Sequence, residues 1–154
     1  MKISQITLLC EISGASYTIT NKSDRKLIGK FTTRNNLPIV MTWINCYPFE
    51  KSVESVIGDA NHWEFEFGDG NDESNLNYTP TNNNNDQMEI FANLINFCQQ
   101  FKHYYNPKII VALFKQPSQQ KAYMRLFKRV WPEFEYDTAT DDESHHCIVG
   151  KSRV

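Results

Sequence analysis

One run of six apolar residues constrains the fold more than any other feature of the chain. Ile109–Phe114 reads IIVALF, and it is bounded by Asn106-Pro107 before it and by Pro117 after it. A strand that is apolar at every position is typical of the middle of a sheet, whereas a half-exposed strand alternates apolar and polar residues. The run therefore predicts a central strand that is covered on both faces.

A helical pattern flanks this run on each side. Asp86-Gln87-Met88-Glu89 fits an Asp form of the capping box, so we expect a helix that begins at Asp86 and stops at residues 104–107. A second helix is predicted over residues 119–130, with residues 117–118 as its cap. Its apolar side chains are spaced to face inward (Tyr123, Leu126, Phe127, Val130), and its basic ones to face outward (Lys121, Arg125, Lys128).

The rest of the chain reads mainly as strands. Residues 62–67 alternate three aromatic side chains with one histidine and two glutamates, which predicts a strand with one apolar and one charged face. Turn residues at 21–24 predict a hairpin between strands at 16–20 and 26–33. Further strands are expected at 3–12, 37–44, 75–81, 133–137 and 146–151, and residues 48–57 are ambiguous between helix and loop.

This order of elements predicts one α+β domain over residues 1–154, with a mixed, mostly antiparallel sheet flanked by helices. A chain of 154 residues has the usual length of one domain. It contains no apolar run long enough to span a membrane and no clear signal peptide. Its four cysteines are far apart, which excludes CxxC zinc and redox motifs and favours reduced thiols. We therefore expect a soluble cytoplasmic protein without membrane partners.

Charge is sharply segregated along the chain. Residues 99–130 contain seven basic side chains and no acid, whereas residues 132–144 contain six acids and no base. Such segregation predicts faces of opposite sign that steer charged partners, or surfaces that neutralise each other after folding. A basic face on the second helix could hold phosphates, but a pI near 6.1 argues against a nucleic-acid partner.

From Trp63 to Lys151, the order of strands, helix, buried strand, helix and hairpin resembles the GNAT family of acyl-CoA-dependent N-acetyltransferases. In that family the strand before the first helix splays from its neighbour, and a glycine-rich loop binds the coenzyme A pyrophosphate with backbone amides at the helix N-terminus. The resemblance places acetyl-CoA at Asn82, Asn83, Asn84 and Asn85. This stretch has no glycine or basic residue, although asparagine tolerates the left-handed backbone that an amide nest requires.

The resemblance also suggests catalytic positions. The family's tyrosine, which protonates the departing thiolate, corresponds to Phe127, which has no proton to give. Tyr123, one turn earlier, is the candidate substitute, with a core tyrosine as the alternative. A base for the amine would be Glu66 or Glu64, both of which are otherwise ordinary surface carboxylates.

Three functions remain open on these observations. We favour a GNAT-like domain with eroded catalytic signatures that acts through protein contacts and binds no cofactor, and an asparagine-rich, motif-poor chain would suit a phage accessory protein. The first alternative is an active N-acetyltransferase that uses acetyl-CoA. The second is an acidic inhibitor that mimics a nucleic acid.

No metal site is expected from the sequence. Residues 141–147 gather acids, histidines and a cysteine, but the adjacent His145 and His146 would point to opposite faces of a strand. A solvated acidic loop is the simpler interpretation. His62 and His103 have no visible partner in the sequence.

Overall fold

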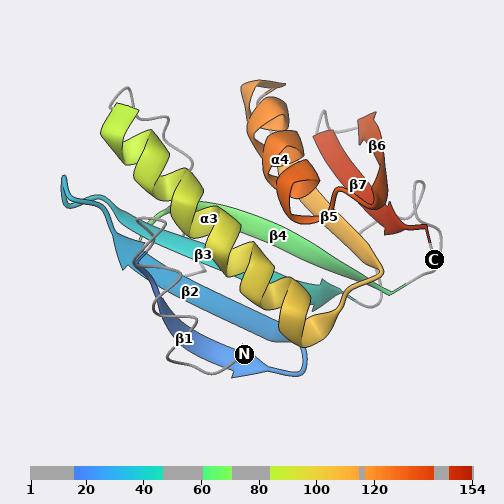
Figure 1. Cartoon of the computed structure of the whole chain (residues 1–154), viewed down its shortest axis with the longest axis horizontal. Helices are drawn as coiled ribbons and strands as arrows, with labels where there is room; N and C mark the ends of the chain where they lie inside the picture. The colour runs from blue at the N-terminus through green and yellow to red at the C-terminus, as the bar shows by residue number, and fades with distance from the viewer. Residues whose placement is uncertain (1–15, 47–60, 71–83, 115–116, 141–145, 154) are drawn as a thin grey trace.

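The computed structural model of the chain describes residues 16–46, 61–70, 84–114, 117–140 and 146–153 (Figure 1). Within these residues one seven-stranded sheet has the order β1-β2-β3-β4-β5-β7-β6. Its strands are β1 (Thr18–Ser23), β2 (Lys26–Thr32), β3 (Pro38–Cys46), β4 (His62–Asp69), β5 (Ile109–Phe114), β6 (Phe134–Thr140) and β7 (His146–Ser152). The helices are α3 (Asn84–Tyr105) and α4 (Pro117–Val130).

The sheet is mixed, with one parallel junction. Among the strands that the structure describes, only β4 and β5 pair in parallel, and the other neighbouring strands are antiparallel. The connection from β4 to β5 runs through α3, as a parallel crossover requires. The predicted α+β class with a mostly antiparallel sheet and flanking helices is confirmed.

Most predicted elements within the described residues are present, with small shifts of their ends. The first hairpin forms, but its turn lies at Asp24-Arg25, after a β-bulge between Ile19 and Asn21. The alternating segment forms β4, and the apolar run forms β5 at the predicted residues. The strands expected at 3–12 and 75–81 and the ambiguous segment 48–57 lie outside the described residues.

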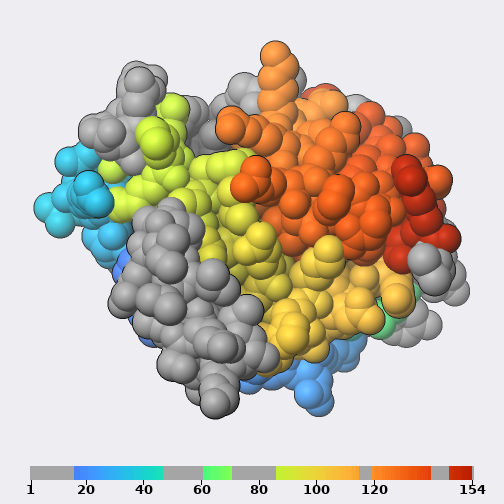
Figure 2. Space-filling view, viewed as in Figure 1, coloured from blue at the N-terminus to red at the C-terminus, as the bar shows by residue number. Residues whose placement is uncertain are grey.

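Both helices pack on the same face of the sheet, which we call the helix face (Figure 1). In the space-filling view α3 and α4 lie next to each other on it (Figure 2). Aromatic rings dominate the contact: Trp43 of β3 stacks on Phe101 of α3 at 4.1 Å and lies 6.0 Å from Phe127 of α4. Since all three side chains are fully buried, they form the centre of the main core.

The opposite side of the sheet, which we call the rear face, is also buried at its centre. Side chains that point to it alternate with those of the helix face along each strand. Side chains on it that are exposed by 2% or less include Ile28, Val40, Thr42, His62, Val111 and Val149. The apolar character of β5 at every position is thereby explained, because Ile110 and Val111 are fully buried on opposite faces.

The ends of α3 differ in how well they were predicted. The helix begins at Asn84, two residues before the predicted start. At its other end the Asn106 N–H donates to the Lys102 carbonyl at 3.0 Å, and Asn106 adopts a φ of 45°. A left-handed residue directly after the last turn satisfies a helical carbonyl and ends the helix, as predicted for residues 104–107.

Among the described residues, no helix combines the length and the apolar character that crossing a membrane requires. The cysteines that the structure describes (Cys46, Cys98, Cys147) form no disulfide. Burial raises the pKa of the Cys98 thiol well above its usual range, so this side chain behaves as a small apolar group.

Candidate functional site

The two predicted catalytic residues project toward opposite faces of the sheet. Tyr123 of α4 is 2% exposed and contacts the rings of Phe65 and Phe67 on the helix face, at centroid distances of 6.0 and 5.6 Å. Glu66 lies between these two phenylalanines on β4, so its exposed side chain points to the rear face. The fold therefore does not bring this acid–base pair together on one face.

The parallel junction between β4 and β5 is short. Its ladder has three residue pairs, which run from Trp63–Ile110 to Phe65–Ala112. β4 continues to Asp69 and β5 to Phe114, so the carboxyl-terminal ends of both strands extend beyond the ladder. These stretches (residues 66–69 and 113–114) pair with β3 and β7 but not with each other, and we refer to them as the distal ends of β4 and β5.

Aromatic side chains occupy the helix face of these distal ends. Tyr123 packs against Phe67 of β4 at 5.6 Å and stacks on Phe114 of β5 at 5.9 Å with an interplanar angle of 25°. Phe114 is itself 4% exposed. Tyr123 thus bridges the two diverging strands as a packed core residue.

The predicted cofactor loop is described only in part. Asn84 and Asn85 form the first residues of α3, whereas Asn82 and Asn83 lie outside the described residues. The capping box expected from Asp86 to Glu89 is wrong, because both carboxylates bind the turn between β2 and β3 instead. Asp86 accepts a hydrogen bond from the Asn35 side-chain amide at 3.2 Å, and Glu89 accepts the Arg34 backbone N–H at 3.0 Å.

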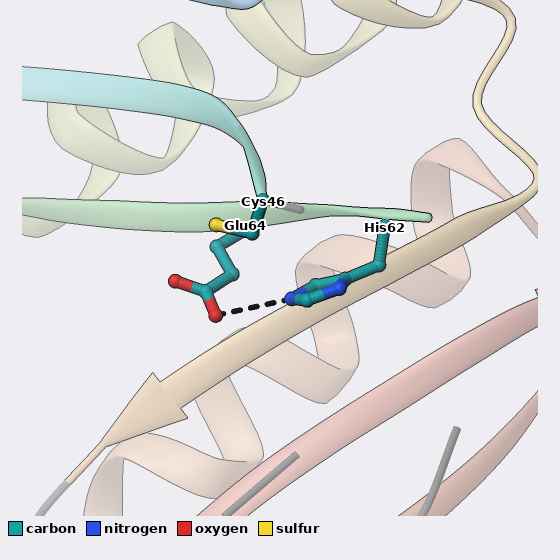
Figure 3. A group of neighbouring side chains, drawn as sticks. All are labelled: Cys46, His62 and Glu64. Atoms are coloured by element: carbon teal, nitrogen blue, oxygen red, sulfur yellow. Dashed lines mark hydrogen bonds and ion pairs between the residues drawn. The ribbon is translucent and has the colours of Figure 1, made fainter. Parts of the chain in front are cut away.

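A different group of polar side chains comes together on the rear face, near the start of β4 (Figure 3). Cys46 of β3 pairs in register with His62 of β4, and Glu64 follows His62 two residues later. His62 Nε2 lies 3.1 Å from Glu64 Oε1, and each residue offers one ligand atom within 4.8 Å of the other two. The expectation that His62 has no partner is therefore wrong.

Burial distinguishes this group from a surface ion pair. The His62 side chain is fully buried, the Glu64 side chain is 20% exposed, and Cys46 is half-buried. The alternating pattern of β4 placed His62 and Glu64 on one face, but it suggested a solvated face. The sequence did not show the register of β3 against β4, which places Cys46, the last residue of β3, opposite His62.

The outward face of α4 is basic, as predicted. Lys121, Arg125 and Lys128 are exposed, and the Arg125 guanidinium lies 4.7 Å above the ring of Phe91 of α3. The aromatic contact fixes one of the three charges against the neighbouring helix.

The acidic segment that follows is partly neutralised in the described residues. Lys102 Nζ lies 2.7 Å from Glu133, and Arg153 Nε lies 3.4 Å from Glu135. Residues 141–145 lie outside the described residues. His146 stacks on Phe114 at 5.6 Å on the helix face, whereas Cys147 belongs to the apolar cluster of the rear face.

In the part of the chain that the structure describes, the fold and this geometry define a small α+β domain with one parallel strand junction and a partly buried Cys-His-Glu group. A family model described as a family of unknown function (DUF6934) matches residues 15–140, and the chain belongs to this family. No curated protein and no solved structure matches the chain.

Proposed function

We propose that the chain is a divergent, non-catalytic domain of the GNAT acetyltransferase type that acts by binding another protein. Its likeness to that architecture rests on the order of its elements and on the short β4–β5 ladder, which leaves the strand before α3 diverging from its neighbour. This divergence is the feature that the resemblance implies.

The observation that carries the non-catalytic part of the proposal is the aromatic packing at the distal ends of β4 and β5. Tyr123 is buried between Phe67 and Phe114, and Phe127, at the family's tyrosine position, is fully buried. A phenyl ring cannot protonate a thiolate, and Glu66 points to the rear face. These residues support a domain that has kept the architecture and lost the acid–base arrangement.

Titration with acetyl-CoA tests this part directly. We expect no calorimetric heat of binding and no thermal shift at up to ~1 mM, the upper end of ordinary substrate KM values. Micromolar binding that is lost when Asn83 and Asn84 are replaced by tryptophan would overturn the proposal. Micromolar binding that these replacements leave unchanged would also overturn it, and would place the cofactor elsewhere.

An active N-acetyltransferase is the second candidate, because the diverging strands also suit a cofactor enzyme. It predicts acetyl transfer to an amine that falls in Glu66→Gln and Tyr123→Phe at unchanged thermal stability. The non-catalytic proposal predicts no transfer by any of the three proteins.

The protein-binding part is supported by the free edge of the sheet at β6. The Ser152 N–H donates to the Lys108 carbonyl at 2.8 Å, so the backbone of Ser152 faces β5 and not β6. Because backbone groups alternate along an antiparallel pair, the N–H groups of Tyr136 and Thr138 point outward from β6. In the described part of the chain no strand lies beyond them.

The surroundings of this edge suit an extended partner segment. An open groove of about 620 Å³ lies beside this edge, and both aromatic side chains and charged side chains of both signs line it. The lining residues are Lys128, Pro132, Phe134, Glu135, Tyr136, Asp137 and Arg153. An edge strand next to such a groove can accept a further strand through main-chain hydrogen bonds. The partner is therefore a protein segment that adds to β6.

Thr138→Pro tests the edge without removing any bond of the β6–β7 ladder. Proline deletes an outward N–H at an exposed position, which edge strands tolerate. The partner cross-linked to the wild-type protein in its native cells should be retained by Thr138→Ala and lost by Thr138→Pro. Equal recovery with both variants would exclude strand addition at β6.

The acidic-mimic alternative receives less support. Two of the acids near β6 form ion pairs with Lys102 and Arg153, so the acidic segment presents less free negative charge than its sequence suggested.

A further inference from the structure

We propose that Cys46, His62 and Glu64 form a Zn²⁺ site on the rear face of the sheet. The site is independent of the proposed protein-binding function, because it lies at the junction of β3 and β4 and not at the β6 edge.

The sheet itself sets the geometry of the site. Directly opposed residues of adjacent antiparallel strands have neighbouring side chains, and residues two apart on one strand share a face. Cys46 is opposed to His62, and Glu64 is two residues from His62, so all three side chains project to the same side. Figure 3 shows the Glu64 carboxylate turned toward the His62 imidazole, with Cys46 beside it.

The distances need little change to hold a metal ion. Zinc binds sulfur at about 2.3 Å and nitrogen or oxygen at about 2.0–2.2 Å, so neighbouring ligand atoms of a tetrahedral site lie roughly 3.3–3.6 Å apart. His62 Nε2 and Glu64 Oε1 are already 3.1 Å apart, and no pair of ligand atoms in the group exceeds 4.8 Å. A movement of about 1 Å by the Cys46 thiol or the Glu64 carboxylate would bring the three ligand atoms to these separations.

The donor set selects zinc over the hard cations. Mg²⁺ and Ca²⁺ take oxygen ligands, whereas one thiolate, one imidazole and one carboxylate suit zinc. The Cys46 thiol contacts the Ile44 carbonyl at 3.6 Å, and metal binding would release its proton. Three protein ligands leave a tetrahedral position for water or another ligand.

The three proposed ligands differ in burial, and therefore in how freely each can move. The His62 ring is fully buried and so has little freedom to move, and its position is set before a metal ion binds. Cys46 and Glu64 are partly exposed and provide access for the ion. Neither of them is needed for the main core, so both can be changed without emptying it.

Titration of the tag-free, EDTA-treated full chain with Co²⁺ and Zn²⁺ tests the site. We expect one ion per chain and a near-ultraviolet thiolate-to-cobalt absorption band. Cys46→Ala should abolish this band, and Cys46→Ala and Glu64→Gln should each weaken Zn²⁺ affinity about 100-fold or more, since even outer-shell changes cost 10–100-fold. At a hundredfold excess of Zn²⁺ over its Kd, Tm should rise by about 5–10 °C.

Matched controls separate ligation from folding. Cys147→Ala and Glu135→Gln remove the same side-chain types on β7 and β6 and should leave the cobalt band and the affinity unchanged. Near-ultraviolet circular dichroism of each metal-free variant checks that it is folded. Absence of stoichiometric uptake, or uptake that is indifferent to Cys46→Ala in a folded protein, would overturn the proposal.

Discussion

The close approach of α3 to the sheet depends on Gly29 of β2. A Cβ atom at this position would lie 2.8 Å from Cε1 and 2.9 Å from Cδ1 of Phe97, and 3.1 Å from Cε of Met41. Favourable carbon contacts lie at about 3.5–4.0 Å, and both neighbours are fully buried, so neither can move into solvent. Gly29→Ala therefore forces the ring of Phe97 away from β2.

The size of the effect follows from two opposing terms. Overpacking a well-filled core costs about 1–3 kcal/mol. Alanine is preferred over glycine in a strand by roughly 0.5–1 kcal/mol, which offsets part of this cost. We expect Gly29→Ala to lower the free energy of unfolding by about 1–2 kcal/mol, or Tm by roughly 2–8 °C.

A double-mutant cycle measured by urea denaturation checks the cause. Phe97→Leu shortens the side chain that the new methyl group meets, so the double variant should be more stable than the sum of the single changes by about 1 kcal/mol. Gly150→Ala, whose Cβ would instead meet Tyr136 at 2.7 Å, provides a matched control and should combine additively with Phe97→Leu. Additivity within about 0.5 kcal/mol for the Gly29 pair would refute the reasoning.

Three further predictions concern polar side chains that fasten the elements together. The Tyr136 hydroxyl donates to the Trp131 carbonyl at 2.6 Å, so Tyr136→Phe should lower the free energy of unfolding by about 1 kcal/mol at pH 7. Burial, and to a smaller extent the Glu133 carboxylate, raise the pKa of Tyr136. Because a raised folded-state pKa gives stability that is lost as pH rises above about 10, urea titrations there should show a steeper loss for the wild type than for Tyr136→Phe, and parallel curves would contradict this. Although burial acts in the opposite direction, the hydrogen bond from Lys102 lowers the pKa of Glu133, so Glu133→Gln should cost roughly 0.5 kcal/mol at pH 7. This cost should shrink as the pH falls past the ordinary glutamate pKa and disappear below the lowered pKa of the folded state; a difference that persists there would exclude the ion pair as its source. The Tyr105 hydroxyl donates to the Ser23 carbonyl at 2.6 Å, so Tyr105→Phe should speed hydrogen exchange in the β1–β2 hairpin selectively, whereas a uniform change across the sheet would contradict that role.

The elements that were predictable from the sequence are those whose pattern is local. The apolar run predicted that β5 is a strand inside the sheet, and the alternation of residues 62–67 predicted β4. The inward residues of α4 followed from helical spacing alone, and Tyr123 and Phe127 are buried as expected. In each case a periodicity within a few residues determines which side chains are covered.

The features that could not be predicted depend on partners that are distant in sequence. The Asp86–Glu89 pair matched a capping box, but backbone and side-chain donors of the β2–β3 turn bind those carboxylates in the folded chain. The charged face of β4 appeared solvated because nothing in the sequence shows that the rear face is buried. The pairing of Cys46 with His62 depends on strand register, and no local pattern encodes that.

The three-pair ladder between β4 and β5 also divides the sheet mechanically. On one side lie β1 to β4, joined in chain order by antiparallel ladders that are longer than the β4–β5 ladder, and on the other lie β5, β7 and β6, which all come from the last third of the chain. Each block is held by its own ladders. The seam between the blocks depends on three residue pairs and on α4, whose Tyr123 and Phe127 contact Phe65 of β4. A force applied across the sheet, from β1 to β6, will therefore concentrate at this seam, and single-molecule stretching should show it part before either block unravels.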